Sequence, residues 1–205
     1  MEKKPVLIVI AGPNGSGKTS ITSKILKHEW TESCVYINPD FIAQEKFGDW
    51  NSPEAVRKAV VFAQEQREQC IAENKSLIFE TVLSTQEKVD FVAKAKEKGY
   101  FVRLFFVCTN SPKINAFRVA TRVLEGGHDV PIPKIISRYG RSIENAIDIS
   151  KVADRAYFYD NSENNEEAKL LFRLSDGGIY KRYLSLKSYS WASPIFDFFE
   201  PEKSE

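Results

Sequence analysis

The chain has 205 residues, of which 42% are apolar and 12% aromatic. This length and composition fit one domain with a real hydrophobic core and exclude a chain that is disordered throughout. The 29 basic and 28 acidic residues give a formal net charge of +1, which argues against a dedicated nucleic-acid or membrane-surface binder.

Three further features predict a cytoplasmic protein. No apolar run approaches the roughly 20 residues that a membrane span needs, and the start of the chain leads into a strand-like stretch without a signal-peptide pattern. Cys34, Cys70 and Cys108 are well separated, each in an apolar context. We expect them to be reduced, buried thiols, because disulfide frameworks use dense, even-numbered cysteines.

Strands and helices alternate up to residue 160. Residues 5–11 form a continuous β-branched run, which predicts a strand buried on both faces. Ser52 and Pro53 are typical of a helix start, and Gly99 of a helix stop. Such signals predict strands at 5–11, 35–37, 76–79, 100–108 and 156–159, and helices at 18–28, 53–73, 85–98, 112–124 and 134–149. This alternation predicts a mostly parallel sheet covered on both faces.

The C-terminal segment follows a different pattern. Residues 169–174 and 179–184 flank the turn sequence Ser-Asp-Gly-Gly and predict a β-hairpin. The tail is rich in aromatic residues, namely Trp191, Phe196, Phe198 and Phe199. We expect them to extend the core, with an exposed partner surface as the alternative. The prediction is therefore one α/β domain at residues 1–165, with residues 166–205 packed on it.

A phosphate-binding loop follows the first predicted strand. The segment G-P-N-G-S-G-K-T at 12–19 matches G-x-x-x-x-G-K-S/T, with a strand before it and an amphipathic helix after it. Its N–H groups should converge on the β-phosphate of ATP, while Lys18 bridges the β- and γ-phosphates and Thr19 ligates Mg²⁺. The expected nucleotide-binding residues are Gly12, Pro13, Asn14, Gly15, Ser16, Gly17, Lys18, Thr19, Ser20 and Asn161. The alternative is a glycine-rich turn with an exposed lysine.

Polar residues end the second and third predicted strands, at the sheet edge where open α/β folds bind ligands. Asp40 follows the second strand and could take the proton of an acceptor hydroxyl as the general base. Its alternative role is to cap a helix starting near Phe41. Asn38, Glu80 and Thr81 are candidates for binding the acceptor, and Glu80 could instead hold a water on Mg²⁺.

The basic residues are unevenly distributed. Residues 111–142 contain six basic and two acidic residues, whereas the C-terminal third has an acidic excess. Arg118 and Arg122 share one helix face, and Arg138 and Arg141 lie in a polar stripe with Lys134 and Asn145. The expected apolar face of that helix consists of Ile136, Tyr139, Ile143 and Ile147. Arginines delivered by a mobile lid would stabilise charge on the transferring phosphoryl group, and a solvated surface is the alternative.

The connection between these two helices reads Gly126-Gly127-His128. We predict a hinge here, with residues of about 125–145 acting as a lid that closes over the nucleotide. His128 is a candidate for substrate binding, although a single histidine is more often a loop or core residue. A metal site is not expected, because no second histidine is nearby.

Five segments, in this order along the chain, carry a more specific signal. They are A-G-P-N-G-S-G-K-T (11–19), I-N-P-D-F-I-A (37–43), F-E-T-V-L-S (79–84), R-V-L-E-G-G-H-D-V-P (122–131) and R-Y-G-R-S-I-E-N (138–145). Together they resemble the zeta-toxin family of P-loop kinases, in its short stand-alone branch. The resemblance implies a P-loop NTPase fold and ATP-dependent phosphorylation of a sugar hydroxyl, with UDP-N-acetylglucosamine as the acceptor known for toxin members. It also implies Asp40 as base, Lys18 and the lid arginines as charge stabilisers, and an antitoxin partner.

Two other function classes stay open from the sequence. The first is a nucleoside, nucleotide or polynucleotide kinase on the same scaffold. The second is a nucleotide-dependent switch or transport ATPase, although the chain has neither an N-K-x-D motif nor an L-S-G-G-Q signature.

Overall fold

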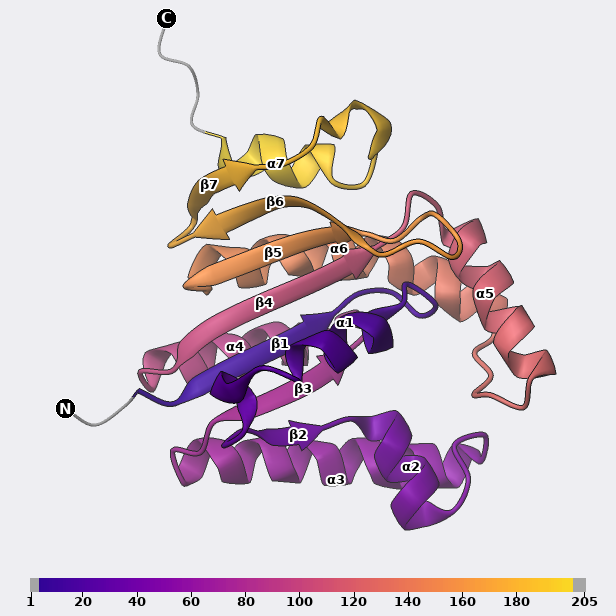
Figure 1. The fold of residues 1–205 in the computed structure, drawn as a ribbon. Coiled ribbons are helices and arrows are strands. Elements are labelled where there is room, and N and C mark those ends of the chain that lie inside the picture. Colours follow the sequence, from indigo (N-terminus) through magenta and orange to yellow (C-terminus); the bar gives the residue numbers. More distant parts are fainter. Residues whose placement is uncertain (1–3, 201–205) are drawn as a thin grey trace, which may run out of the picture.

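The computed structural model describes residues 4–200, which form one sheet with seven strands in the order β2-β3-β1-β4-β5-β6-β7 (Figure 1). The strands are β1 (Val6–Ala11), β2 (Val35–Ile37), β3 (Leu77–Thr81), β4 (Phe101–Cys108), β5 (Arg155–Asp160), β6 (Lys169–Ser175) and β7 (Gly178–Arg182). Strands β1 to β5 pair in parallel, and β6 and β7 are antiparallel. The predicted mostly parallel α/β fold with a C-terminal hairpin is confirmed.

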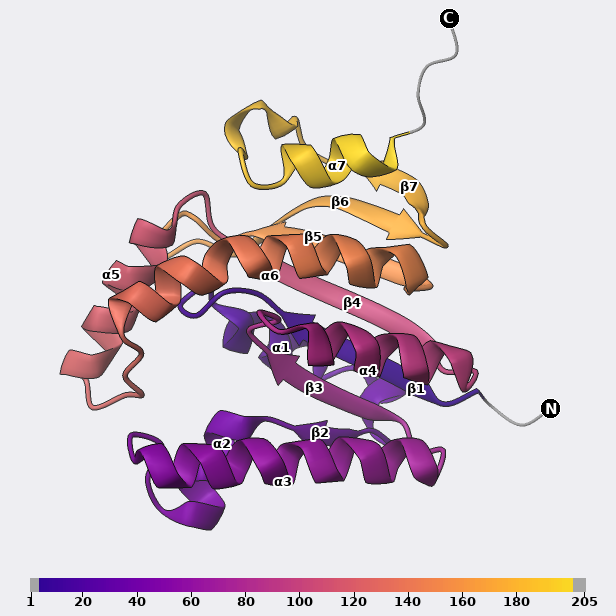
Figure 2. The ribbon, with the colours of Figure 1, turned by 180° about the vertical axis from the view of Figure 1, so that it is seen from behind.

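Helices surround the sheet unevenly. They are α1 (Lys18–Ile25), α2 (Pro39–Phe47), α3 (Pro53–Ala72), α4 (Gln86–Glu97), α5 (Pro112–Leu124), α6 (Ile132–Val152) and α7 (Ser193–Phe199), with short 3-10 turns η1 (Glu29–Thr31) and η2 (Leu186–Ser188). Helices α3, α4, α6 and α7 lie on one face (Figure 2), and α1 lies on the other. Because the parallel strands point the same way, their carboxyl ends meet at one edge, beside α2 and α5.

The largest part of the core lies under α3, α4 and α6. It contains Leu7, Val9, Phe79, Leu104 and Phe106 from the central strands, all with no exposed surface. Their alternate neighbours, such as Ile8 and Ile10, form a second cluster under Ile21 and Ile25 of α1. Strands with both faces buried explain why β1 reads as a continuous apolar run rather than an alternating one.

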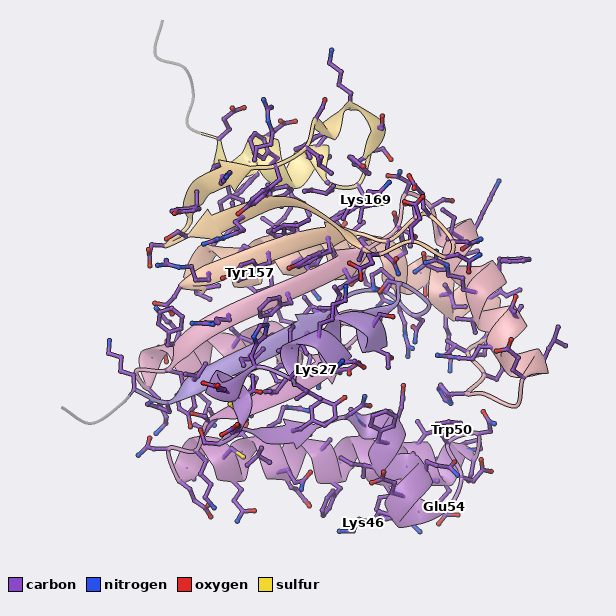
Figure 3. The ribbon with its side chains drawn as sticks, in the orientation of Figure 1. Lys27, Lys46, Trp50, Glu54, Tyr157 and Lys169 are labelled. Atoms are coloured by element: carbon purple, nitrogen blue, oxygen red, sulfur yellow. The ribbon has the colours of Figure 1, made fainter. Side chains whose placement is uncertain are left out.

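The prediction that helices cover both faces is wrong for half of the sheet. Within residues 4–200, no helix covers β4 to β7 on the side of α1 (Figure 1). Tyr157 of β5 stands on this face (Figure 3) and stacks on Phe105 of β4, with 4.6 Å between the ring centroids. The reason is the connectivity, because both helices between β4 and β5 avoid this face and β5, β6 and β7 are joined without an α-helix.

Most helix boundaries agree with the local signals. Ser52 accepts a hydrogen bond from the N–H of Ala55 at the start of α3, and Ser111 caps α5 in the same way. The helix predicted at 18–28 ends earlier, at Ile25. Helix α6 starts at Ile132 and buries Ile135, whereas Ile136, predicted on the apolar face, is 54% exposed. That face is thus shifted by one residue at the beginning of α6.

The C-terminal segment joins the same sheet. Strand β6 pairs with β5, and Trp191, Ile195, Phe196 and Phe199 are buried against the core, while Phe198 is exposed. Phe158 of β5 stacks on Phe172 of β6, with centroids 4.5 Å apart. The expected core role of the aromatic tail therefore holds for three of the four side chains named in the prediction. The domain boundary near residue 165 stays a prediction.

The structure also tests the expectations for the cysteines and for a membrane-spanning helix. Cys34, Cys70 and Cys108 are free thiols; Cys70 and Cys108 are buried, whereas Cys34 is only half-buried. Burial raises the pKa of the Cys108 thiol to about 12, so this thiol stays protonated at neutral pH. Among residues 4–200, no helix combines the length and apolar character that crossing a bilayer would take.

Arg67 connects α3 to α4 from inside the protein. The Arg67 side chain is 2% exposed, donates to Glu87 at 2.9 Å and lies over the rings of Phe79 and Phe91. Removing the carboxylate leaves a buried charge without its partner. We expect Glu87→Gln to lower the free energy of unfolding by about 2–4 kcal/mol, and Arg67→Met to restore most of it in the double variant.

Urea denaturation of the three variants measures this coupling. Glu54→Gln is the control, because Glu54 pairs with Lys58 at the surface of α3 and the loss of an exposed pair costs much less than the loss of a buried one. Equal losses for Glu87→Gln and Glu54→Gln would contradict the structural importance of the buried arginine.

Candidate active site

The phosphate loop connects β1 to α1 and approaches other backbone closely. Gly15 and Gly17 have φ of 75° and 88°, a region that favours glycine. A Cβ on Gly15 would lie 2.5 Å from the carbonyl oxygen of Asn115, and one on Gly17 would lie 2.1 Å from Nδ2 of Asn161. Within residues 4–200 the N–H groups of Gly15 and Gly17 bond to no acceptor. Both glycines are therefore sterically required, and their N–H groups are free for an anion.

Side chains from two other elements hold this loop in place. Asn115, buried in α5, donates to the carbonyl of Asn14 at 2.7 Å. Asn161, directly after β5, donates to the carbonyl of Ser16 at 2.9 Å. The Oγ of Ser16 is buried and has no partner among the described side chains and backbone. A hydroxyl without a partner in a phosphate-type loop can donate to a bound phosphate oxygen.

Lys18 is the first residue of α1 and folds back over the loop. Its Nζ donates to the carbonyls of Gly12 at 2.8 Å and of Pro13 at 3.0 Å. Burial lowers the pKa of Lys18, and the negative charges of Glu80 and Asp40 oppose this shift. Arg122 adds to the lowering. The structure therefore brings Lys18 within electrostatic reach of three other predicted site residues.

Glu80, at the end of β3, is the centre of a buried hydrogen-bond network. Its carboxylate is 8% exposed, and its Oε1 accepts from Thr22 at 2.7 Å and from the hydroxyl of Tyr36 at 2.6 Å. Burial, followed by the charge of Glu80, raises the pKa of Tyr36 and keeps its hydroxyl protonated. The second oxygen, Oε2, accepts no hydrogen bond from the described residues.

Asp40 lies in the first turn of α2 with an exposed side chain. The alternative role of Asp40 as helix cap is filled by Asn38, whose Oδ1 accepts from the N–H of Asp40 at 2.9 Å. Asn38 also donates to the hydroxyl of Tyr36 at 3.1 Å. The Asp40 carboxylate is thus left free of capping, next to the Glu80 network. Thr81 is occupied locally, since its Oγ1 accepts from the N–H of Leu83.

Arg122 and the Gly-Gly-His segment form one unit at the end of α5. Nη2 of Arg122 donates to the carbonyl of His128 at 2.6 Å. The N–H of Asp129 donates to Oδ1 of Asn51, which lies in the connection between α2 and α3. The α5–α6 loop therefore touches the α2–α3 connection across the carboxyl edge of the sheet. Nδ1 of His128 is buried and has no described partner.

Arg118 binds the loop that follows β5. Its guanidinium donates to the carbonyls of Asn161 at 2.6 Å and Glu163 at 3.0 Å, and to Oδ1 of Asn164. It lies on the wall of a cavity of about 650 Å³ between α1, α5 and the loop after β5. The cavity is lined by Gly17, Ser20, Ile21, Lys24, Phe117, Arg118, Thr121, Arg122, Glu125, Asn161 and residues 163–168.

Helix α6 is fixed to the sheet along part of its length. Ser142 donates to the carbonyl of Val82 at 2.7 Å, and Asn145 donates to that of Leu83 at 3.0 Å. The hydroxyl of Tyr139 donates to the carbonyl of Thr109. Arg138 precedes all three anchors and is half-buried, whereas Arg141 lies between Tyr139 and Ser142 and bonds to its own helix at the carbonyl of Ser137.

Comparison with models of protein families shows which family this chain belongs to. The model of the family described as zeta toxin matches residues 1–166. The chain belongs to the zeta toxin family. The match ends just before β6, so it spans the phosphate loop, Asp40, Glu80 and the arginine segment but not the hairpin or α7.

Similar proteins support the fold of this zeta toxin family member. A crystal structure of AvrRxo1-ORF1:-ORF2 with ATP has a TM-score of 0.67 and 19% identity, covering 98% of this chain and 65% of the other. The PezAT toxin–antitoxin system of Streptococcus pneumoniae gives 0.59 and 16%, covering 100% and 81%. A uridine kinase of Anoxybacillus flavithermus is 41% identical over 46 residues, 22% of each chain. This chain thus spans less than two thirds of the length of AvrRxo1-ORF1 and of the uridine kinase.

Several residues of the candidate site were not predicted from the sequence. Tyr36 and Thr22 bind Glu80, Asn115 supports the phosphate loop, and Phe117 lines the cavity. Only Asn115 has a weak sequence signal, because it is a polar residue in the first turn of the helix that Ser111 and Pro112 begin. The others look like ordinary strand, helix or surface residues until the chain is folded.

The donor set agrees with a magnesium ion held together with ATP. Among the described residues, no cluster of three or more His, Cys, Asp or Glu side chains could hold a metal by itself. Thr19, exposed in the first turn of α1, offers a hydroxyl, and Oε2 of Glu80 is free to accept from a water. Mg²⁺ commonly keeps several waters and takes most other ligands from phosphate oxygens, and these residues fit that pattern.

Proposed function

We propose that this protein is an ATP- and Mg²⁺-dependent kinase that transfers the γ-phosphoryl group of ATP to a hydroxyl of a small molecule. The observation that carries this proposal is the convergence of Lys18, Asp40, Glu80 and Arg122 at the mouth of the phosphate loop. Membership of the zeta toxin family agrees with it. A nucleotide switch would not need a free carboxylate beside the phosphate loop.

The nucleotide would occupy the phosphate loop and the adjoining cavity. Its phosphates would accept from the free N–H groups of Gly15 and Gly17 and from Lys18, which would exchange the carbonyls of Gly12 and Pro13 for phosphate oxygens. The base and ribose would lie between α5 and residues 161–168, where Phe117 offers an exposed ring. Ser20 and Asn161 would line the passage between the two parts.

Asp40 would be the general base. Its carboxylate takes the proton of the acceptor hydroxyl while the acceptor oxygen bonds to the γ-phosphorus. The bond between that phosphorus and the β–γ bridging oxygen breaks, and ADP leaves. Lys18 and Arg122 would stabilise the negative charge on the transferring group. Mg²⁺, held by Thr19 and by waters that Glu80 orients, would supply further positive charge when bound.

The acceptor side of the site would consist of Asn38, Glu80, Thr81 and His128. Asn38 and Glu80 would act through the hydroxyl of Tyr36, to which both are hydrogen-bonded.

We propose that the lid is shorter than residues 125–145. Three hydrogen bonds fix Tyr139, Ser142 and Asn145, so closure would move the segment up to about Arg138. Arg138 would then approach the phosphates, while Arg141, between two of these anchors, would keep its place on α6. Arg118 would shape the nucleotide pocket rather than touch the γ-phosphate.

The finer parts of the proposal concern the acceptor and the partner. We infer a nucleotide sugar such as UDP-N-acetylglucosamine as the acceptor, in a cytoplasmic reaction, because of the family membership. We also propose an antitoxin partner, since the PezAT system is a toxin–antitoxin pair and AvrRxo1-ORF1 is described with ORF2.

An acceptor screen with γ-labelled ATP tests the proposed function. We expect saturable transfer of label to one nucleotide sugar, and none in the absence of Mg²⁺. Transfer to nucleosides or to 5′-hydroxyl oligonucleotides instead would replace the acceptor while keeping the kinase. ATP hydrolysis without any labelled acceptor across sugars, nucleosides and oligonucleotides would contradict the kinase.

A further inference from the structure

Trp191 of the C-terminal segment contacts the end of β5 through a hydrogen bond. Its indole Nε1 donates to Oδ2 of Asp160 at 2.9 Å, and both side chains are buried, with exposed fractions of 4% and 3%. The ring also packs against Phe106, with centroids 5.8 Å apart. Trp191 lies beyond the residues that the zeta toxin family model matches, so family membership assigns it no role.

Asp160 in turn shapes the loop that follows β5. Its Oδ1 accepts from the N–H of Ser162, and its Oδ2 accepts from the hydroxyl of Ser162, each at 2.9 Å. These two bonds close a turn around Asn161. The hydroxyl of Ser162 also accepts from the N–H of Asn110 at 2.8 Å, and Asn110 donates from Nδ2 to the carbonyl of Ser188, just before Trp191.

Asn161, held inside this turn, reaches the phosphate loop. Its Nδ2 donates to the carbonyl of Ser16 at 2.9 Å, while its own N–H donates to the carbonyl of Cys108 at 2.8 Å. The residues that follow, 163–168, line the cavity next to the phosphate loop. A continuous series of hydrogen bonds therefore runs from Trp191 through Asp160 and the 160–162 turn to the phosphate loop.

The Trp191 bond matters because Asp160 is a buried carboxylate. Burying a charged group is costly unless hydrogen bonds replace the lost water, and no lysine or arginine forms an ion pair with Asp160 among the described residues. Two of its three bonds come from Ser162 within the same turn. Trp191 supplies the one bond to Asp160 from a distant element. It adds to the bonds from Asn110 to Ser162 and from Asn161 to the carbonyl of Cys108, which hold the turn beside the end of β4.

We propose that Trp191 is a positioning residue for nucleotide binding, acting through Asp160 and Asn161 on the phosphate loop. This proposal rests on the proposed ATP site. It gives the C-terminal segment a function in addition to core packing: the segment pre-organises the nucleotide pocket. Because the network contacts neither Asp40 nor the acceptor side, its loss should weaken ATP binding and leave the chemical step intact.

The decisive variant is Trp191→Phe, which keeps an aromatic ring in the core and removes only the Nε1–H donor. We expect the Kd and KM for ATP to rise about tenfold, with kcat at saturating ATP unchanged. Phe196→Leu is the matched control. Phe196 is similarly buried in the same segment and packs on Phe172, and its ring has no N–H or O–H group that could donate to Asp160. It should lower the Tm without changing the ATP affinity.

A double-mutant cycle tests the same bond from the other side. Asp160→Asn replaces an accepting oxygen by an NH₂ group or forces the amide to turn, so it should also weaken ATP binding. The double variant should bind ATP no more weakly than Asp160→Asn alone, because both changes remove one interaction. Additive losses would contradict coupling through this bond.

The outcomes separate this inference from the proposed function. If the wild type does not bind ATP, or if Lys18→Met binds it equally well, the nucleotide site itself is wrong. If the wild type binds, Lys18→Met does not, and Trp191→Phe retains wild-type affinity, only the positioning role is wrong. Equal loss of ATP affinity in Trp191→Phe and Phe196→Leu would likewise overturn it, since general destabilisation would then explain both.

Discussion

Replacing Asp40 by asparagine is expected to lower kcat for phosphoryl transfer by about 10²- to 10⁴-fold while ATP still binds. Asparagine has the same shape but takes no proton from the acceptor hydroxyl. Helix α2 should stay intact, because its start depends on the side chain of Asn38 and the backbone N–H of Asp40, both of which remain. Single-turnover transfer from labelled ATP measures the chemical step, and calorimetry measures the Kd for ATP.

Glu45→Gln is the matched control for this variant. Glu45 lies on the same helix with an exposed side chain, so the change also removes one negative charge from α2. We expect its kcat to equal that of the wild type. Full activity in Asp40→Asn, or an equal loss in Glu45→Gln, would show that Asp40 is not the base.

Replacing Lys18 by methionine is expected to weaken ATP binding by about a hundredfold or more, because charge-assisted hydrogen bonds to phosphate are lost. The ligand-free protein should nevertheless become more stable at neutral pH. Burial lowers the pKa of Lys18 from its ordinary value of 10.5, despite the attraction of Glu80 and Asp40. Its charged form therefore costs folding free energy until a phosphate is bound.

The pH dependence of this stability difference has a definite sign. The folded-state pKa of Lys18 lies below the unfolded value of 10.5, so the penalty is fully present below the folded pKa. It is relieved as pH rises from there towards the unfolded value. We therefore expect the advantage of Lys18→Met in urea denaturation to shrink at alkaline pH.

Lys27→Met is the control for the lysine variant. Lys27 follows α1 with an exposed side chain (Figure 3). It should retain both ATP affinity and stability. A Lys18→Met protein that is less stable than the wild type at pH 7 would mean that the buried ammonium contributes to folding rather than opposing it.

The phosphate loop and the alternation of strands and helices could be predicted because they are local. Gly15 and Gly17 need positive φ, and the strand before them and the helix after them are encoded within a few residues. The predicted position of Asp40 at the sheet edge follows from the same topology. Asn38 as the cap of α2 could also have been inferred, since Pro39 stands at the first helical position.

The roles of the arginines could not be separated by sequence alone. Arg118 and Arg122 are one helical turn apart, yet Arg118 binds the loop after β5 whereas Arg122 binds the carbonyl of His128. The spacing places both on one face, but it does not specify which distant loop passes each guanidinium. Each contact depends on where the tertiary fold places the loop after β5 and the α5–α6 loop relative to α5.

Composition gave a net charge of +1, and the motifs located a phosphate loop, a base candidate and a basic segment. The tertiary structure decided which of these groups meet. It brought Tyr36 and Thr22 to Glu80, fixed α6 through Ser142 and Asn145, and joined Trp191 to Asp160. Local signals arise from interactions between residues close in the chain, whereas these contacts join residues far apart in it. Which distant residues come into contact is determined when all the helices and strands pack into one core. A local sequence pattern therefore does not predict these contacts.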